Sequence, residues 1–384
     1  MDPIARRLAL LGAILLLVAG CGGSPTAEDT EGAAGDDGSA ADPADSGEGD
    51  DSDPFAAIFE ELEGLDTEER TQRLVELAEE EGELNVYTSN TDLAAFTDEF
   101  TDTYGVEVSV YRAQANTVLQ RLLQEHEAGF AGADLYDTNA VELATANAEG
   151  LLRDYDGGPA EEGLVEASEQ EGWTGSRLNV FTVSWNTDLV DEPPTSYEDL
   201  ADERFDGLTI MEPRASEWYM TLSTYFTEQE GMSQEEVDEL FSEIASHSVQ
   251  VEGNTTHANF LAAGEYGVST SVYNHLVDEL TDTGAPVLRE PPVEPIVVRP
   301  NGIGLLRSAQ NPASAVLLFE WLLTDGQELL TEEFRIPART ELQQGALDGL
   351  ETIDVDVEQL VAEVAEWDER YEMLLQNAQG TDEG

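Results

Sequence analysis

The chain has 384 residues, 40% of them hydrophobic and 26% charged, so it is long enough to bury a substantial core. Acidic residues outnumber Lys and Arg by 83 to 16, which gives a formal net charge of -67. Such a polyanion excludes binding to nucleic acid or to an anionic membrane surface through a general electrostatic field. The single cysteine excludes a disulfide framework and any zinc or redox site built on paired cysteines.

The negative charge belongs mainly to the body of the chain. Residues 1–54 hold 12 acidic and 2 basic residues, so residues 55–384 keep 71 and 14, or about -57. Repulsion of this size destabilises a compact state unless salt screens it. We therefore predict a halophilic protein that works in salty surroundings outside the cytoplasm. An ordinary acidic protein is the alternative.

The N-terminus is predicted to be a targeting segment. Arg6 and Arg7 precede the apolar run Leu8 to Ala19, which is too short for a relaxed membrane span and typical of a signal peptide. The sequence Val18-Ala19-Gly20-Cys21 resembles the lipobox of bacterial lipoproteins. The resemblance implies a signal peptide over residues 1–20, lipid attachment at Cys21 and anchoring to the outer face of the cell membrane. A plain signal peptide is the alternative.

Residues 21–54 are predicted to form a disordered acidic tether. From residue 22 on they are Gly, Ser, Ala, Pro, Asp, Glu and Thr, with no large apolar side chain. Such a segment cannot bury enough surface to offset its chain entropy. The folded body is therefore expected over residues 55–384.

The first half of the body is predicted to alternate between helix and strand. Apolar residues at helical spacing predict two helices within Phe55 to Glu81, with a turn near Gly64. The expected strands that follow are Leu84–Ser89, Val106–Tyr111 and Ala133–Tyr136, and the expected helices are Leu93–Tyr104, Ala115–Glu127 and Ala140–Ala148. This order predicts a parallel sheet with helices on both sides.

A second alternating pattern begins at Leu178. The expected strands are Leu178–Trp185, Leu208–Met211, Gly267–Tyr273 and Gly302–Leu306, and the expected helices are Trp218–Phe226, Ser233–Ser246, Thr256–Ala263, Pro312–Leu323 and Val357–Leu375. The Pro-rich segment Val287–Val298 is interpreted as an extended crossing between two lobes. The sequence thus predicts an α/β protein whose two lobes each have a central sheet flanked by helices.

Ligands of such sheets bind beyond the carboxyl ends of the strands, which defines a candidate cleft. The candidate ligand-binding residues are Ser89, Asn90, Gln114 and Asn116 from the first lobe and Glu212, Arg214, Tyr273 and His275 from the second. Arg214 is notable because the chain has few cations, and its planar fork suits a carboxylate or phosphonate, or a companion anion beside a metal. A surface arginine paired with a neighbouring acid is the alternative.

The common catalytic motifs are missing from the sequence. The chain has no lysine and hence no P-loop, and it contains neither HExxH nor GxSxG. Gly302-Ile-Gly304 lacks the third glycine of a dinucleotide fingerprint, and the four histidines show no paired metal spacing. We therefore predict a protein that is not an enzyme and needs no cofactor. A secreted α/β enzyme is kept as an alternative, as is a sensor or structural lipoprotein.

Several segments resemble the solute-binding lipoproteins of ABC importers, in particular the ferric-iron-type branch of bacterial extracellular solute-binding proteins. The segments that carry the resemblance, in chain order, are Gly82–Ser89, Phe96–Val110, Asn186–Val190, Pro194–Leu200, Gly284–Val287 and Asn311–Leu323. Together they cover most of Leu84 to Arg339. The resemblance implies a two-lobed type II periplasmic-binding-protein fold that closes over one small solute and delivers it to the membrane permease.

The resemblance also leaves a metal ligand open. Ferric-binding members carry adjacent tyrosines at the strand end where this chain has Tyr273-Asn274-His275. Phenolate oxygen suits a hard cation, so Tyr273, His275 and Tyr219 would be the ligands if ferric iron were bound. Other branches bind polyamines, thiamine or phosphonates. Ferric iron is therefore an alternative to a small organic solute.

The expected lobe boundaries follow from the same patterns. Lobe 1 is predicted to hold residues 83–178 and 300–345, and lobe 2 residues 179–299 and the C-terminal helix within 346–384. The expected partners are a small-molecule or metal-ion ligand and the transmembrane subunits of an ABC permease. We expect a monomer that touches the membrane only through its lipid anchor.

Overall fold

The structure is a computed structural model, and it describes residues 53–155 and 158–380. The predicted signal peptide, Cys21 and the tether up to residue 52 lie outside the described residues. Within the described ranges, no helix is both long and apolar enough to cross a membrane.

The body begins with two helices, as the spacing of apolar residues predicts. They are α1 (Ala56–Leu62) and α2 (Thr67–Ala78). Asp66 begins α2 with a capping box, in which its carboxylate accepts a hydrogen bond from the Glu69 backbone N–H at 3.0 Å. Buried Leu62 and Leu74 join these helices to the core of the first lobe.

The first lobe is built on three parallel strands. Its elements are β1 (Leu84–Thr88), α3 (Leu93–Tyr104), β2 (Val108–Arg112), α4 (Ala115–Glu127), β3 (Leu135–Asn139), α5 (Ala140–Ala148) and β4 (Leu152–Arg153). β1 pairs in parallel with both β2 and β3. β3 begins and ends later than predicted. Asp137, Thr138 and Asn139, which follow the predicted strand Ala133–Tyr136, therefore form the last residues of β3.

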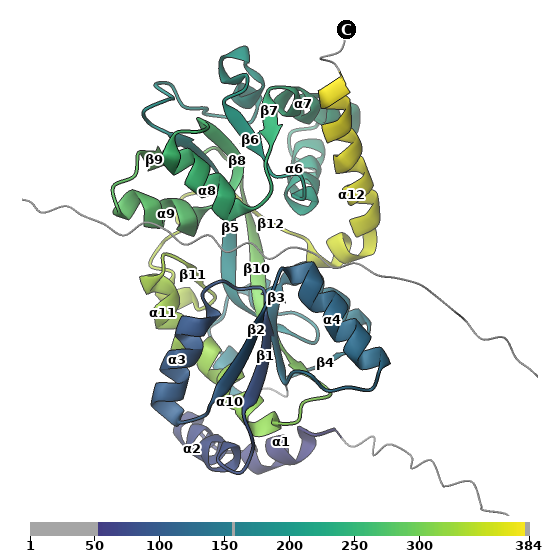
Figure 1. Ribbon diagram of the computed structural model, residues 1–384, viewed down its shortest axis with the longest axis vertical. Coiled ribbons are helices and arrows are strands. Elements are labelled where there is room, and N and C mark those ends of the chain that lie inside the picture. Colours follow the sequence, from purple (N-terminus) through teal and green to yellow (C-terminus); the bar gives the residue numbers. More distant parts are fainter. Residues whose placement is uncertain (1–52, 156–157, 381–384) are drawn as a thin grey trace, which may run out of the picture. The chain divides into compact units, whose positions relative to one another are not determined.

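The second lobe is also built on parallel strands flanked by helices. Its elements are β6 (Thr209–Met211), α6 (Ser216–Glu228), α7 (Gln234–Ser246), β7 (Ser248–Gln250), α8 (Asn254–Ala263), β8 (Val268–Tyr273), α9 (Asn274–Asp282) and β9 (Val287–Leu288). β6 pairs in parallel with β7 and β8. In Figure 1, α6 and α7 lie on one side of these strands and α8 and α9 on the other. The predicted two-lobed α/β fold is confirmed.

Two long antiparallel strands connect the lobes. They are β5 (Thr174–Asn186) and β10 (Ile296–Leu306), and they lie next to each other in the strand order β2-β1-β3-β10-β5-β8-β6-β7. Figure 1 shows both strands running through the region where the two groups of helices meet. The strands of both lobes therefore belong to one continuous hydrogen-bonded sheet.

The single strand β10 lies where the sequence analysis predicted two separate elements. The prediction placed an extended crossing over Val287–Val298 and a distinct strand over Gly302–Leu306, yet Ile296–Leu306 forms a single strand. Gly302 is required there, because a Cβ atom would lie 2.3 Å from the carbonyl oxygen of Thr174 and 2.6 Å from the ring of Trp173. The GxG pair is thus explained by close packing within the sheet.

The C-terminal part adds helices that the sequence analysis only partly predicts. The remaining elements are α10 (Pro312–Leu323), α11 (Gly326–Glu332), β11 (Ile336–Pro337), β12 (Thr352–Asp354) and α12 (Val357–Gly380), together with short 3₁₀ segments at Pro159–Glu161, Glu166–Ser168, Glu198–Ala201, Glu203–Phe205 and Thr340–Leu342. α12 packs against α6 and α7 of the second lobe and also against α5 of the first. The division of the chain at residues 178, 299 and 345 stays a prediction.

Candidate functional site

The strand ends of the first lobe bring together polar side chains. Thr88, the last residue of β1, donates from Oγ1 to Asp137 Oδ2 at 2.6 Å. The hydroxyls of Ser89 and Thr138 lie 2.7 Å apart, and the backbone N–H of Asn90 donates to Thr88 Oγ1 at 2.8 Å. The predicted site residues Ser89 and Asn90 therefore lie directly beside the end of β3.

One predicted pair of residues meets across the two lobes. Arg214 lies in the loop after β6, and Gln114 immediately precedes α4. The Nη2 atom of Arg214 donates a hydrogen bond to Gln114 Oε1 at 3.4 Å. Arg214 also forms an ion pair with Glu252, and its side chain is 58% exposed. Arg214 thus pairs with a neighbouring acid, as the alternative interpretation expects, and it also contacts the opposite lobe. Its role in binding an anion stays a prediction. Asn116 is exposed in the first turn of α4.

Glu212 is buried and holds two loops of the second lobe together. Its carboxylate accepts hydrogen bonds from the backbone N–H groups of Arg214, at 3.2 Å, and Gly253. Gly253 has a φ of +98°, a backbone conformation that favours glycine. Burial raises the pKa of Glu212, and the two backbone donors offset that rise only in part. Its carboxylate oxygens are thus directed at the protein's own backbone.

Tyr273 ends β8, as the sequence predicts, and His275 lies in the first turn of α9, a helix that was not predicted. Their rings stack with centroids 5.8 Å apart. The Tyr273 hydroxyl accepts a hydrogen bond from Arg299 Nη2 at 3.0 Å, and burial raises the pKa of that hydroxyl. Burial and the charge of Arg335 lower the pKa of His275 to about 3, so this imidazole is neutral at physiological pH.

Arg299 connects the lobes at the base of the site, and the sequence analysis missed it. This residue of β10 is 2% exposed and forms an ion pair with Glu217 of α6. It also donates to Asn139 Oδ1 at 3.2 Å and to Asn301 Oδ1 at 3.1 Å. A charged residue within a run of buried strand residues was the available signal, because buried arginine is rare unless it is paired.

A second missed network lies nearby and contains two further buried arginines. Arg177 of β5 donates from Nη1 to Asp137 Oδ1 at 2.8 Å, and Arg335, which precedes β11, forms an ion pair with Asp92. Both arginines contribute to the electrostatic environment of His275. Chain segments more than 150 residues apart thus meet at this point, which no local sequence pattern shows.

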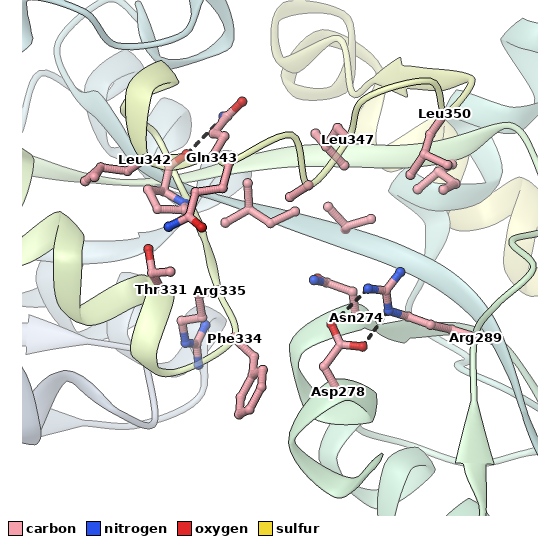
Figure 2. Close-up of a pocket in the computed structure, with 16 residues that line it drawn as sticks. Asn274, Asp278, Arg289, Thr331, Phe334, Arg335, Leu342, Gln343, Leu347 and Leu350 are labelled. Carbon is pink, nitrogen blue, oxygen red and sulfur yellow. Dashed lines mark hydrogen bonds and ion pairs between the residues drawn. The ribbon is translucent and has the colours of Figure 1, made fainter. Parts of the chain in front are cut away.

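A cavity of about 200 Å³ lies beside this network (Figure 2). Figure 2 shows Phe334 and Arg335 on one wall and Asn274, with the ion pair of Asp278 and Arg289, on the opposite one. Leu347 and Leu350 close a third side. The cavity therefore combines an apolar wall with polar groups from both lobes.

Tyr219, considered as a metal ligand, lies in the core of the second lobe. Its side chain is buried, its hydroxyl donates to Asp238, and its ring stacks on Tyr371 at 5.4 Å. Across residues 53–155 and 158–380, no group of three or more His, Cys, Asp or Glu side chains is arranged to hold a metal ion. The environment of Tyr219 is therefore that of a packing residue.

Comparison with known proteins identifies the family. Residues 95–348 match the family model described as bacterial extracellular solute-binding protein. The chain belongs to this family. Such solute-binding proteins are components of ABC importers and work on the periplasmic or extracellular side of the membrane, so substrate capture for import is the role of this chain.

Solved structures of other solute-binding proteins share the fold. Iron-bound HitA from Pseudomonas aeruginosa has a TM-score of 0.62 and 16% sequence identity, over 76% of this chain and 99% of that one. AfuA from Actinobacillus pleuropneumoniae, with fructose-6-phosphate bound, has a TM-score of 0.65 and 20% identity, over 77% and 99%. The Atu4243-GABA receptor has a TM-score of 0.63 and 18% identity, over 77% and 98%. At these identities the likeness establishes the type II periplasmic-binding-protein fold.

Proposed function

We propose that this solute-binding protein is a lipid-anchored monomer that closes its two lobes over one small polar solute and presents it to an ABC permease. The hydrogen bond between Gln114 and Arg214 carries the proposal, because it joins loops of opposite lobes across the strand ends. Buried polar networks at Arg299 and Arg177 lie beneath those strand ends. Convergent buried polar groups at an interlobe cleft are what a small ligand requires for orientation.

The proposed cleft retains the residues predicted from the sequence, with two different roles. Ser89, Asn90, Gln114, Asn116 and Arg214 lie at strand ends or in adjoining first turns, whereas Glu212 supports the loops that carry Arg214. Tyr273 and His275 form the wall contributed by β8 and α9. The solute would bind between these two groups of side chains as the lobes close.

Thermal shift and solution scattering test this function on the purified protein in molar salt. A solute that binds only the native state raises the melting temperature with the logarithm of its concentration. We expect at least one solute from a library of sugars, amino acids, polyamines and organic anions to raise the melting temperature and reduce the radius of gyration. If no class of solute changes either quantity, the capture function is wrong.

Ferric iron is the second candidate, because HitA carries iron and Tyr273 is a phenol at a strand end. Two observations oppose it. The Tyr273 hydroxyl already accepts a hydrogen bond from Arg299. The positive charges of Arg335 and Arg177 near His275 repel a trivalent cation. Titration with ferric citrate tests this candidate. We expect no visible phenolate charge-transfer band, and a band that Tyr273→Phe weakens would restore ferric iron as the solute.

A hydrolytic enzyme receives little support from the serine–histidine contact between α8 and β8. His257 Nδ1 lies 2.8 Å from Ser269 Oγ, and its Nε2 lies 2.7 Å from the carbonyl oxygen of Val251. Both side chains are fully buried. Since Nε2 faces a backbone carbonyl rather than a carboxylate, the pair lacks the third group of a triad and access to substrate. We therefore propose a binding role without catalysis.

A further inference from the structure

Two buried guanidinium groups near the cleft have donors without acceptors. Arg177 is 4% exposed and Arg335 is 8% exposed. Each forms one ion pair, with Asp137 and Asp92 respectively, but the Nε–H group of each is buried and has no hydrogen-bond partner. A buried donor without a partner costs about 1–3 kcal/mol. Two such donors in the same region indicate an acceptor that is supplied from outside the chain.

The backbone register places the two arginines near each other. Pro337 of β11 pairs with Arg177 of β5, and Arg335 lies two residues before Pro337. Arg335 directly precedes β11, and its guanidinium is close enough to that of Arg177 for the two charges to act on each other. Asn179, which lies two residues after Arg177 and is 5% exposed, lies on the same face of β5 as Arg177. The two arginines and one amide therefore line one patch.

The hydrogen-bond balance of this patch favours an anion. Asp137 offsets the charge of Arg177 and Asp92 that of Arg335, but each carboxylate leaves the Nε–H group of its arginine without an acceptor. The pKa of Arg335 is lowered by burial and then by the charge of Arg177. His275 faces the same patch as a neutral ring. An oxyanion between the two guanidinium groups can accept hydrogen bonds from the donors that these carboxylates leave free. In a chain with 83 acidic residues against 16 Lys and Arg, such a pair is exceptional.

From these observations we infer that the captured solute carries an oxyanion, a carboxylate, phosphonate or phosphate group, which binds between Arg177 and Arg335 at the base of the cleft. The inference rests on the proposed capture function and adds its substrate class. The oxyanion accepts charge-assisted hydrogen bonds from the two free Nε–H groups. His275 is neutral and therefore adds no charge to the patch. Binding thus satisfies both buried donors in the closed state.

Calorimetric titration of the purified protein in molar KCl tests the inference with three probes: inorganic phosphate, methylphosphonate and butyrate. We expect at least one probe to bind and Arg335→Gln to weaken its binding at least about tenfold, as loss of a charge-assisted hydrogen bond does. Arg177→Lys, which keeps the ion pair with Asp137 but lacks the fork, should weaken binding similarly. The exposed Arg73, paired with Glu61, provides the matched control, and Arg73→Gln should bind as the wild type does.

The outcomes separate the substrate class from the function. Methylphosphonate or butyrate binding more tightly than inorganic phosphate supports an organic anion as the solute, and equal binding of phosphate supports a free anion. Binding that survives both arginine substitutions overturns the inference. A neutral or cationic solute that closes the lobes while all three anions fail also overturns it but leaves the capture function intact. Melting curves without solute show whether each variant is folded. If a variant is not folded, the wild-type titrations alone decide whether the protein binds an oxyanion.

Discussion

Glu142 and Glu217 approach the same guanidinium group, that of Arg299, from α5 and α6. Burial, and then the charge of Glu217, raise the pKa of Glu142 from its ordinary 4.5 to about 7, although Arg299 and Asn139 oppose the rise. The folded state therefore keeps a proton that the unfolded chain releases above pH 4.5. This contribution to stability is present at low pH and is lost as pH rises through 7.

We expect Glu142→Gln to remove that pH dependence. At pH 8 the variant should be more stable than the wild type by about 3 kcal/mol, since each unit of pKa shift corresponds to about 1.4 kcal/mol. At pH 5 the two proteins should differ far less. Urea unfolding in molar salt at both pH values measures the difference. Glu149→Gln, an exposed acid at the end of the same helix, is the control, and curves for Glu142→Gln that run parallel to the wild type would refute the assignment.

Individual site residues were predictable only where topology places them. Ser89 and Tyr273 follow from the rule that ligands bind beyond the carboxyl ends of parallel strands. Arg177, Arg299 and Arg335 could not be predicted in the same way. Their partners come from other strands and helices, and only the pairing of β5 with β10 and β11 brings them together.

At the scale of elements, α12 (Val357–Gly380) connects the two lobes. Val357 packs in the core of α4 and α5, whereas Trp367 and Tyr371 pack in the core of α6 and α7. The Tyr371 hydroxyl also donates to the carbonyl oxygen of Glu212 at 2.9 Å. The C-terminal helix therefore fixes the strand end that carries Arg214.

Tyr371→Phe tests that role of α12. The variant keeps the buried ring and loses one buried hydrogen bond, so we expect the free energy of unfolding to fall by about 1 kcal/mol. Urea unfolding measures the change, and Tyr266→Phe, at a partly exposed tyrosine of the same lobe, should be close to neutral. An equal effect of the two substitutions would show that the bond to Glu212 contributes nothing.

Helices were easier to predict than strands. The predicted bounds Leu93–Tyr104 and Ala115–Glu127 match α3 and α4, because an amphipathic period and a following glycine mark such helices locally. β10 was predicted as two elements because the Pro-rich segment Val287–Val298 was interpreted as a crossing rather than as the start of a strand. Short β4, β7, β11 and β12 were not predicted, since two or three residues carry no periodicity, and the helices α9 and α11 were also missed.

At the scale of the whole molecule, the charge of about -57 on residues 55–384 makes stability depend on salt. Raising salt from 0.01 M to 1 M shortens the Debye length from about 30 Å to about 3 Å and screens the repulsion between carboxylates. We expect the melting temperature to rise by roughly 10 °C, which corresponds to a few kcal/mol for a chain of this size. Sucrose in place of salt is the uncharged control. A melting temperature that does not change with KCl would contradict adaptation to salt.

The proposed anchor belongs to the residues outside the described part, and a single substitution tests it. Cys21→Ser removes the thiol that would carry the lipid, so the protein should appear in the soluble fraction or the medium while its body stays folded. Cell fractionation followed by immunoblotting measures the distribution, and Ser24→Ala is the control. Unchanged retention in the membrane fraction would rule out lipidation at Cys21.

The ladder between β5 and β10 determines which contacts move when the cleft opens. Seven residue pairs join the two strands, and a β-ladder yields to twisting more readily than to stretching of its hydrogen bonds. We therefore expect the proposed opening to be a torsion about this ladder. Arg299, a residue of β10, would then be displaced little, whereas the contact between Gln114 and Arg214 would separate. Release of a solute would leave the network of Arg299 assembled for the next round of capture.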